Sequence, residues 1–487
     1  MRKLLDASSQ RMIRILETLT IHDDWITLSD LSSAIGASER TVADDISNLQ
    51  KRWGKILHIE VSRKNGVIMH NRNIASIGRV FTDLFNDSVA LLWVKELLFN
   101  PNKPIDFYEA KLFVSRSTLI RLMTRINHFF SERGMTIQCI NNKYQLLGKD
   151  EQYLRDFSAS FLLELYGFDL QNYDITIDMK VMGEIIMYPI SQYLEPPELS
   201  WVLNDDITIT YWLMFYIISL VRENQGYTVT SHYSVEKEID TQKLAYIQVN
   251  FPHITLDNLR PIHQLLFNRF CGWDSASEKS LVSKETDAFF QRLFSVIPVT
   301  PNENTQYLMG FMLKSLYLNK KYRPIKTSAL FNRIYYFSLS LKQANGFLYK
   351  AVEDNLKPFS QNVHIDLCAN VDDTLFWLCL ICPDMNHYTQ AKRALLISDF
   401  GMPHARFLEN TLSSFFNTTY NDSLLIDITH PQYVLTSADV KDYDIIITTI
   451  PDLQLHHKKI FLINDYPSYT DFKEIYILLN SYDQLLT

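Results

Sequence analysis

The chain has 487 residues, 47% of them hydrophobic, with only 13 glycines and 16 prolines. This length exceeds what one hydrophobic core organises, so we expect several domains, and the composition excludes a long disordered or fibrous tract. The first residues lack a secretory signal, and the most apolar segment, residues 207–221, is shorter than the roughly 20 residues that cross a bilayer, so the sequence predicts a cytoplasmic protein without a membrane span.

Charge and cysteine content narrow the class further. Residues 1–150 hold 21 Lys and Arg against 16 Asp and Glu, a net of +5, whereas the remainder holds 26 against 39, a net of −13. A basic N-terminal region followed by an acidic remainder is typical of a nucleic-acid-binding protein, although a net charge of +5 over 150 residues also fits an ordinary protein surface. The cysteines are scattered and the histidines form no ligand cluster, so we expect reduced thiols, no metal site and no cofactor.

A helix-turn-helix pattern begins near the start of the chain, in residues 26–53, which read ITLSDLSSAIGASERTVADDISNLQKRW. Apolar residues at three- and four-residue spacing predict a short helix over 28–35, after which Gly36 can take the positive φ of a tight turn. Ser38 then caps a second helix, because its side-chain oxygen can accept from the exposed amides of the first turn. That helix buries one apolar stripe and leaves the opposite stripe for the major groove.

The same pattern recurs 77 residues later, in residues 103–130, which read KPIDFYEAKLFVSRSTLIRLMTRINHFF. Apolar positions of the first segment fall on apolar positions of the second, and Ser115 takes the place of Ser38 as the cap. Two helical hairpins that merely pack together would give a similar pattern. Duplication favours DNA binding over that alternative.

Each predicted second helix precedes a candidate β-hairpin, at residues 58–70 and 135–148. Asn65-Gly66 is a strong tight-turn signal and Asn141-Asn142 a weaker one. These hairpins are predicted to be the wings of winged helix-turn-helix units, whose tips lie beside a phosphate backbone or minor groove.

The candidate DNA contacts lie on the outer stripes of the two second helices and at the wing tips. Arginines can contact phosphates or guanine edges, so the second copy is electrostatically the stronger, whereas Asp44 in the first copy repels phosphate. The predicted contacts are Arg40, Thr41, Asn48, Arg63 and Lys64 in the first unit and Arg116, Ser117, Thr118, Arg121, Arg125 and Lys143 in the second.

The rest of the chain changes from helical to mixed periodicity. Residues 152–387 are almost wholly helical in pattern, and two aromatic-rich stretches, 207–227 and 304–324, echo each other, which indicates two related bundles. From Lys392, short β-branched runs alternate with helical stretches and predict a small, largely parallel α/β domain. The fold class is therefore a mainly α multidomain protein with a duplicated winged helix-turn-helix, two all-α bundles and a C-terminal α/β domain.

This order of modules resembles the Mga/AtxA-type virulence regulators of Gram-positive bacteria, over essentially the full length of the chain. The resemblance rests on the duplicated winged units and the terminal strands, because no single short motif is diagnostic. It implies winged units at 1–75 and 76–150, bundles at 151–285 and 286–388 similar to phosphotransferase-system regulation domains, and a domain at 389–487 similar to enzyme IIB.

The resemblance also implies a function and partners. The family binds double-stranded DNA at promoters, activates genes for virulence or surface functions, and responds to histidine phosphorylation by phosphocarrier proteins of sugar uptake. His232, His263 and His387 are the positional candidates for phosphorylation. A homodimer is expected by analogy. One departure is that the loop after the first strand of the terminal domain has Ser398 and Asp399 where a catalytic IIB domain has a phosphocysteine, so we expect no enzyme activity.

Three other readings remain open. The chain lacks the common sequence-visible catalytic motifs, which disfavours an enzyme. A receiver-type signalling protein would use Asp399, but receivers carry that aspartate after a later strand and need an acidic pair. An RNA-binding antiterminator also has paired regulation domains, but it begins with a small β domain.

Overall fold

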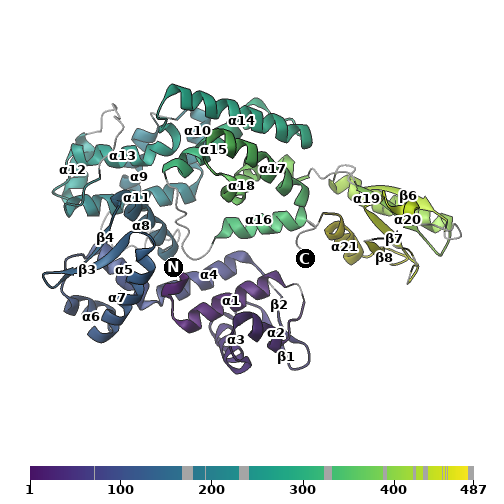
Figure 1. Ribbon diagram of the computed structural model, residues 1–487, viewed down its shortest axis with the longest axis horizontal. Helices are drawn as coiled ribbons and strands as arrows, with labels where there is room; N and C mark the ends of the chain where they lie inside the picture. Colours follow the sequence, from purple (N-terminus) through teal and green to yellow (C-terminus); the bar gives the residue numbers. More distant parts are fainter. Residues whose placement is uncertain are drawn as a thin grey trace. The chain divides into compact units, whose positions relative to one another are not determined.

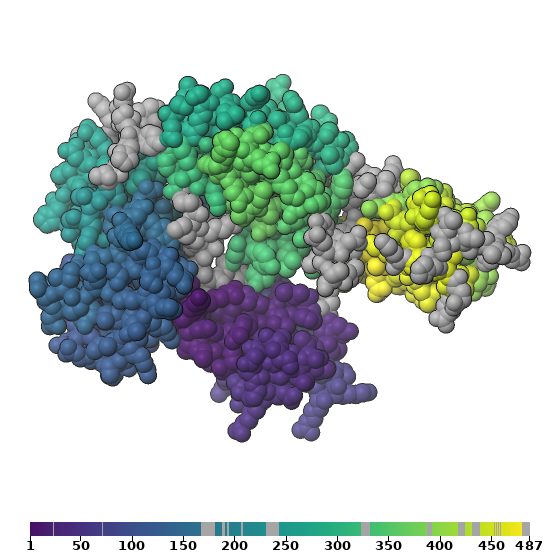
Figure 2. All heavy atoms as spheres, in the orientation of Figure 1, coloured from purple at the N-terminus to yellow at the C-terminus, as the bar shows by residue number. Residues whose placement is uncertain are grey.

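A computed structural model (Figure 1) describes residues 1–480 except 23, 71, 167–178, 192–193, 230–240, 323–331, 388–391, 421–423, 431–436 and the single positions 452, 454, 456 and 458. The space-filling view (Figure 2) shows the described residues in colour. The chain forms two compact units, one of residues 1–272 with 322–333 and the other of residues 273–321 with 334–487.

The first unit begins with a winged helix-turn-helix, as predicted. Its elements are α1 (Ala7–Ile21), α2 (Leu28–Ile35), α3 (Glu39–Trp53), β1 (Ile59–Ser62) and β2 (Gly66–Met69), and a short 3₁₀ turn, η1 (Arg2–Leu4), precedes them. Gly36 ends α2 with φ +71° and Ser38 caps α3 through the Thr41 amide at 3.2 Å, so both local signals of the sequence are confirmed. Helix α1 packs on α2 and α3 and completes the core.

A second winged unit follows the linking helix α4 (Ile74–Asn86). It comprises α5 (Val89–Phe99), α6 (Ile105–Leu112), α7 (Arg116–Ser131), β3 (Met135–Ile140) and β4 (Lys143–Gly148), with β3 and β4 antiparallel. The rings of Trp93, Tyr108 and Tyr144 meet in its core, with centroids 6.1–6.4 Å apart. The boundary expected at residues 75/76 falls in the first turn of α4, which begins at Ile74 and is capped by Asn73.

Helices fill the rest of the first unit: α8 (Glu151–Tyr166), α9 (Met179–Ile190), α10 (Pro196–Leu203), α11 (Asp206–Asn224), α12 (Thr241–Asn250) and α13 (Leu256–Cys271). Helix α11 contains the most apolar segment of the sequence and is buried along most of its length, including Phe215 and Tyr216. A helix that is apolar all round is buried by its neighbours, here α8, α9, α10 and α13.

The second unit opens with five more helices and a change in the expected boundary. They are α14 (Ala276–Val296), α15 (Glu303–Tyr322), α16 (Arg333–Ala344), α17 (Gly346–Val363) and α18 (Val371–Ile381), with short 3₁₀ turns η3 (Cys368–Asn370) and η4 (Pro383–His387). The boundary expected at 285/286 falls inside α14. The division lies at residues 272/273, where Gly272 caps α13.

The C-terminal part is the predicted small α/β domain. Four parallel strands lie in the order β6-β5-β7-β8: β5 (Lys392–Ile397), β6 (Leu424–Thr429), β7 (Ile445–Thr448) and β8 (Ile460–Leu462). Helices α19 (Met402–Tyr420) and α21 (Tyr469–Asn480) contribute to the larger core on one face, and α20 (Ser437–Val440) contributes Val440 to a smaller core with Leu395 and Ile446. Strand β7 is buried at every position, as an interior parallel strand is.

The observed architecture is mainly α and multidomain, with the helix-turn-helix units at the front and a small parallel sheet at the end. Among the helices that the structure describes, none combines the length and apolar character needed to span a bilayer.

Candidate nucleic-acid interface

The outer face of α7 is a cationic surface. Arg116, Arg121 and Arg125 are exposed, as is Ser117 beside the helix N-terminus, and Thr118 is half-buried. No acidic residue interrupts the helix from Arg116 to Ser131. Ser115 caps it by accepting from the Thr118 amide at 3.4 Å, as predicted. The surface therefore offers positive charge and hydrogen-bond donors at the end of the helix that leads into a groove in helix-turn-helix complexes.

The three arginines differ in their surroundings. Arg125 donates to the backbone carbonyl of Leu4 at 2.8 Å, which ties α7 to the N-terminal turn and engages part of its guanidinium. Arg116 and Arg121 make no hydrogen bond or ion pair within the described part of the chain. These two side chains are thus the ones best placed to meet phosphates or base edges without breaking an existing contact.

Helix α3 presents a more mixed face. Arg40 and Asn48 are exposed, but the acids Glu39 and Asp44 are exposed on the same helix. Thr41 is half-buried, and its hydroxyl lies 2.8 Å from Ser38 Oγ, so it takes part in the cap. The electrostatic contrast predicted between the two helix-turn-helix copies is present, because the exposed face of α7 carries more net positive charge than that of α3.

A buried ion pair holds the inner side of α3, which sequence reasoning missed. Asp45 is 3% exposed and accepts from Arg11 Nε at 2.7 Å and from Ser8 Oγ at 2.8 Å, both on α1. The burial of Asp45 on a helix with many polar residues gives no periodic signal. The pair ties the buried side of α3 to α1.

Each recognition helix also anchors its own wing through a side-chain amide. Gln50 Nε2 donates to the Ile59 carbonyl at 2.9 Å. Asn127 both donates to the Ile137 carbonyl at 2.9 Å and accepts from the Ile137 amide at 2.6 Å. Asn127 stands 77 residues after Gln50, whereas Ile137 stands 78 residues after Ile59, so the helix-to-wing contact recurs with the strand shifted by one residue.

The same offset relates a third strand-like contact in each unit. Isolated antiparallel bridges join Ile26 to Val67 and Lys103 to Tyr144. The offset of 77 thus holds at the second wing strand, whereas the first wing strand is offset by 78, since Val61 pairs with Val67 and Cys139 with Tyr144. The sequence comparison matched only the helices, because the wings share few residue types.

The wing tips carry the predicted cations in the open. Arg63, Lys64 and Lys143 are all exposed. Asn141 and Asn142 have φ of +49° and +59°, which the short polar side chain of Asn tolerates better than most residues. The structure therefore places a tight turn where the weaker sequence signal predicted one.

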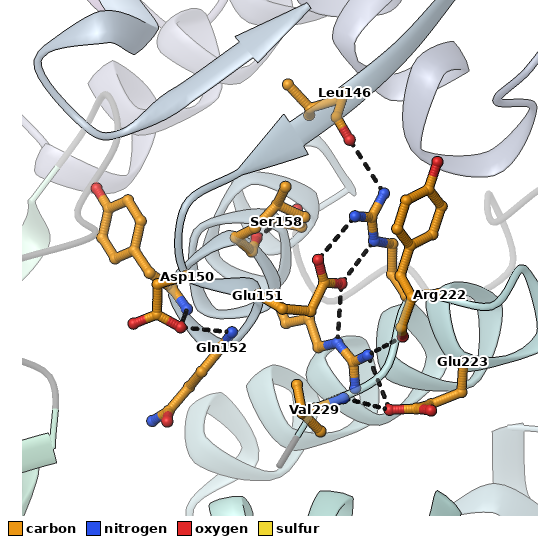
Figure 3. Close-up of polar contacts among 12 residues, drawn as sticks. Leu146, Asp150, Glu151, Gln152, Ser158, Arg222, Glu223 and Val229 are labelled. Carbon is orange, nitrogen blue, oxygen red and sulfur yellow. Dashed lines mark hydrogen bonds and ion pairs between the residues drawn. The ribbon is translucent and has the colours of Figure 1, made fainter.

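A buried ionic network links the second wing to helix α11 (Figure 3). Arg222 donates to both Glu151 carboxylate oxygens, at 2.7 and 2.8 Å, and to the Leu146 carbonyl of strand β4 at 3.1 Å. Arg155 joins Glu151 at 3.2 Å to Glu223 at 3.0 Å. Both arginines are almost fully buried, so their charges depend on these partners.

Further contacts close the network. Glu223 accepts from the Val229 amide and from Asn258 Nδ2, each at 3.0 Å. The Tyr227 hydroxyl donates to Gln145 Oε1 at 2.5 Å, and the Arg222 guanidinium lies 3.8 Å from the Tyr227 ring centroid. Strand β4, helix α8 and helix α11 are consequently joined by a continuous set of polar contacts.

The predicted phosphorylation candidates have different surroundings. His263 on α13 is 3% exposed, with its Nε2 3.0 Å from the Tyr216 hydroxyl, and burial lowers its pKa to about 4. His387 ends a short 3₁₀ turn that begins at Pro383. His232 lies outside the described residues.

The loop after β5 contains a second polar cluster. The Ser398 hydroxyl is buried and lies 2.8 Å from His404 Nδ1, while His404 Nε2 lies 2.8 Å from the Asp465 carbonyl. Asp399 accepts from Thr449 Oγ1 at 2.5 Å. With the imidazole proton on Nε2, His404 donates to the Asp465 carbonyl and accepts from the Ser398 hydroxyl at Nδ1. These contacts hold the loop against α19 and the end of β7.

Comparison with known proteins agrees with this geometry. Residues 8–65 match the M protein trans-acting positive regulator (MGA) HTH domain, and residues 73–162 match the Mga helix-turn-helix domain. A protein of Streptococcus pneumoniae serotype 4, named as a trans-acting regulator, is 27% identical over 168 residues, which is 34% of this chain and 33% of that relative.

Two relatives align along nearly the whole chain. The capsule synthesis positive regulator AcpB of Bacillus anthracis is 20% identical over 98% of this chain and 100% of its own length. The capsule synthesis positive regulator AcpA of the same organism is 19% identical over 97% of this chain and 99% of its own length. Both helix-turn-helix models match in the order that the structure displays, and the two full-length relatives are positive regulators, so the resemblance to Mga/AtxA-type regulators is confirmed.

Proposed function

We propose that the chain is a cytoplasmic transcription activator that binds promoter DNA chiefly through α7. One observation carries the proposal: the capped second helix of a helix-turn-helix exposes Arg116, Arg121 and Arg125 with no acid between Arg116 and Ser131, next to a wing that exposes Lys143. Positive charge gives affinity for phosphates, and arginine forks read guanine edges. Helix α3 makes the weaker contact through Arg40 and Asn48.

The relatives support the class of target. Two of them are named as positive regulators of capsule synthesis, and capsule is a surface structure. We extend this to the present chain as activation of surface or virulence genes.

The test compares duplex DNA with RNA of matched sequence in a mobility-shift titration of the full-length chain. A duplex is first enriched from a random-sequence library by the wild-type chain. The wild type binds this duplex more tightly than the RNA. Replacing Arg116, Arg121 and Arg125 by Ala weakens duplex binding by at least tenfold, and Arg40→Ala weakens it less.

A matched control removes the same charge elsewhere. Lys279, Lys284 and Lys357 are exposed on α14 and α17, so their triple replacement by Ala leaves duplex affinity unchanged. Tighter binding to RNA than to DNA contradicts the proposal and favours an antiterminator. Equal duplex affinity of the wild type and the triple arginine variant contradicts the assignment to α7.

Regulation is proposed to act through the two helical bundles, with phosphocarrier proteins as donors and a homodimer as the active form. A phosphoryl group adds about −1.5 to −2 charges and shifts how helices pack. In the described conformation His263 is buried, so transfer to it requires α13 to open, whereas His232 and His387 are tested directly by His→Ala variants. Radiolabel transfer from a phosphorylated phosphocarrier, followed by sedimentation, measures both the site and the assembly. Absence of label from the wild type contradicts the proposal.

A further inference from the structure

Phe113, in the turn between α6 and α7, stands apart from the other large apolar residues that the structure describes. Its side chain is 92% exposed, more than Tyr469 at 81% or Phe400 at 76%. Exposed apolar residues are common singly, and most need no explanation. Phe113 differs because its backbone is also in an unfavourable conformation.

The backbone of Phe113 has φ +55° and ψ +40°, the left-handed region that favours glycine. The first winged helix-turn-helix shows what the turn requires, because Gly36 takes the same place there with φ +71° and ψ +40°. In both turns the next amide bonds to the carbonyl five residues earlier, Ala37 to Ser32 at 3.2 Å and Val114 to Glu109 at 3.3 Å. This is the helix ending that glycine usually completes. A phenylalanine here costs stability and gains no packing in return.

The electrostatic surroundings of Phe113 indicate what covers it. Lys111 precedes it and Arg116 follows it, and both side chains are exposed. Phe113 lies two residues before the Ser115 cap of α7, at the end of the helix that the proposed function directs into the major groove. An apolar ring between exposed cations is complementary to a polyanion that also has apolar edges. Duplex DNA has both, in its phosphates and in its thymine methyl and deoxyribose groups.

We propose that Phe113 is a DNA-contacting residue that packs its ring against the apolar edge of the duplex beside the N-terminus of α7. This inference rests on the proposed function and adds a contact that does not depend on charge. The strain at Phe113 is then a cost in folding stability, as expected where a residue is retained in an unfavourable conformation at a functional site. The equivalent contact is absent from the first winged helix-turn-helix, where Gly36 has no side chain.

The test exploits the opposite signs expected for stability and affinity. Phe113→Gly relieves the backbone strain and raises the melting temperature by about 2–4 °C. The same change weakens binding to the enriched duplex roughly tenfold, because the apolar contact is lost. The dependence of affinity on salt concentration stays as in the wild type, since no cation is removed.

Further variants separate the ring from the backbone. Phe113→Leu keeps an apolar side chain and the strain, so it retains part of the affinity with little change in melting temperature. Phe113→Asn tolerates the left-handed conformation but is polar, so it behaves as Phe113→Gly does. Phe400→Ala, which removes an exposed ring from the C-terminal domain, leaves duplex affinity unchanged. Replacing thymine by uracil in the duplex weakens wild-type binding if methyl groups make the contact and leaves it unchanged if deoxyribose does.

Two results overturn the inference. One is a Phe113→Gly chain that melts at or above the wild-type temperature and binds the duplex equally well. The other is a loss of self-association in sedimentation with unchanged affinity for DNA, which assigns Phe113 to a protein interface. If the wild type itself fails to bind duplex DNA, the proposed function has failed before Phe113 is tested.

Discussion

One buried residue, His263, makes the folding stability of this chain depend on pH. His263 is enclosed between the parallel ring of Tyr216, whose centroid is 5.4 Å away, and the ring of Phe267 at 6.1 Å. Desolvation favours the neutral imidazole and lowers its pKa to about 4, while burial raises the pKa of Tyr216. A charged imidazole has no carboxylate partner in this contact, so protonation and folding oppose each other.

The first prediction concerns acid stability. Below pH 6.5 the unfolded chain protonates His263 and the folded chain does not until about pH 4, so the stability present above pH 6.5 is lost as the pH falls. At pH 5 the loss is about 2 kcal/mol. Thermal melts at pH 7 and pH 5, followed by circular dichroism, should show a smaller acid shift for His263→Gln than for the wild type.

The matched control for this prediction is the exposed His253, whose replacement by Gln leaves the acid shift as it is in the wild type. An equal shift in wild type and His263→Gln contradicts the burial argument.

At the residue scale, the sequence predicted what local chemistry determines. Gly36, Ser38 and Ser115 hold the conformations expected of a turn and two caps, because glycine flexibility and serine acceptors act within a few residues. The partnership of Asp45 with Arg11 was not predictable, since it joins residues 34 positions apart. The strain at Phe113 was also missed, because the pattern marks a turn without fixing the sign of φ.

At the scale of elements, the winged units are held by contacts from three directions. Side-chain amides fix the wings, the Asp45 ion pair fixes α3, and the Arg222 network fixes β4 against α8 and α11. Buried charge pairs contribute little net stability but are costly to break singly. The network therefore makes the position of the second wing depend on the intact packing of α11.

The second prediction follows from that dependence. Arg222→Met leaves the Glu151 carboxylate and the Leu146 carbonyl without their main partner, and it lowers the free energy of unfolding by about 3–5 kcal/mol. Hydrogen exchange should accelerate at the amides of β4 more than at those of β1 and β2. Chemical denaturation and exchange mass spectrometry measure the two effects.

A double variant and a surface control make this result specific. Adding Glu151→Gln to Arg222→Met restores part of the lost stability, because Arg155 is then left with one carboxylate, that of Glu223, in place of two. Arg260→Ala, which breaks an exposed pair with Asp257, changes stability by less than about 0.5 kcal/mol. A loss for Arg222→Met no larger than that of Arg260→Ala contradicts the role given to the network.

The spacing of apolar residues in the sequence predicted the type of most helices and strands, and also where most of them begin and end. Helices α11 and α15 and strands β5 and β7 lie where apolar spacing predicted them. The boundary expected at 285/286 lies inside α14, whose apolar repeat does not differ from that of its neighbours, and packing places the whole helix in the second unit. The Arg155–Glu223 pair joins residues 68 positions apart, beyond any local pattern.

At the scale of the whole molecule, the distribution of charge along the sequence agrees with the proposal that the first 150 residues bind DNA and the remainder regulates. The front 150 residues carry the excess of cations and both helix-turn-helix units, and the acidic remainder carries most of the other helices and the parallel sheet. An acidic body disfavours nonspecific contact with DNA away from the winged units. Affinity should therefore depend on a few cations, most of them on α7.

The salt dependence of duplex affinity measures this claim most directly. Each neutralised phosphate contributes about 0.9 to the slope of log affinity against log salt. Removing Arg116 and Arg121 together should reduce the magnitude of the slope by about 2, and removing Arg40 by about 1 or less. A slope that stays the same in the Arg116→Ala, Arg121→Ala double variant would mean that α7 does not meet the phosphate backbone, and the account of DNA binding would be wrong.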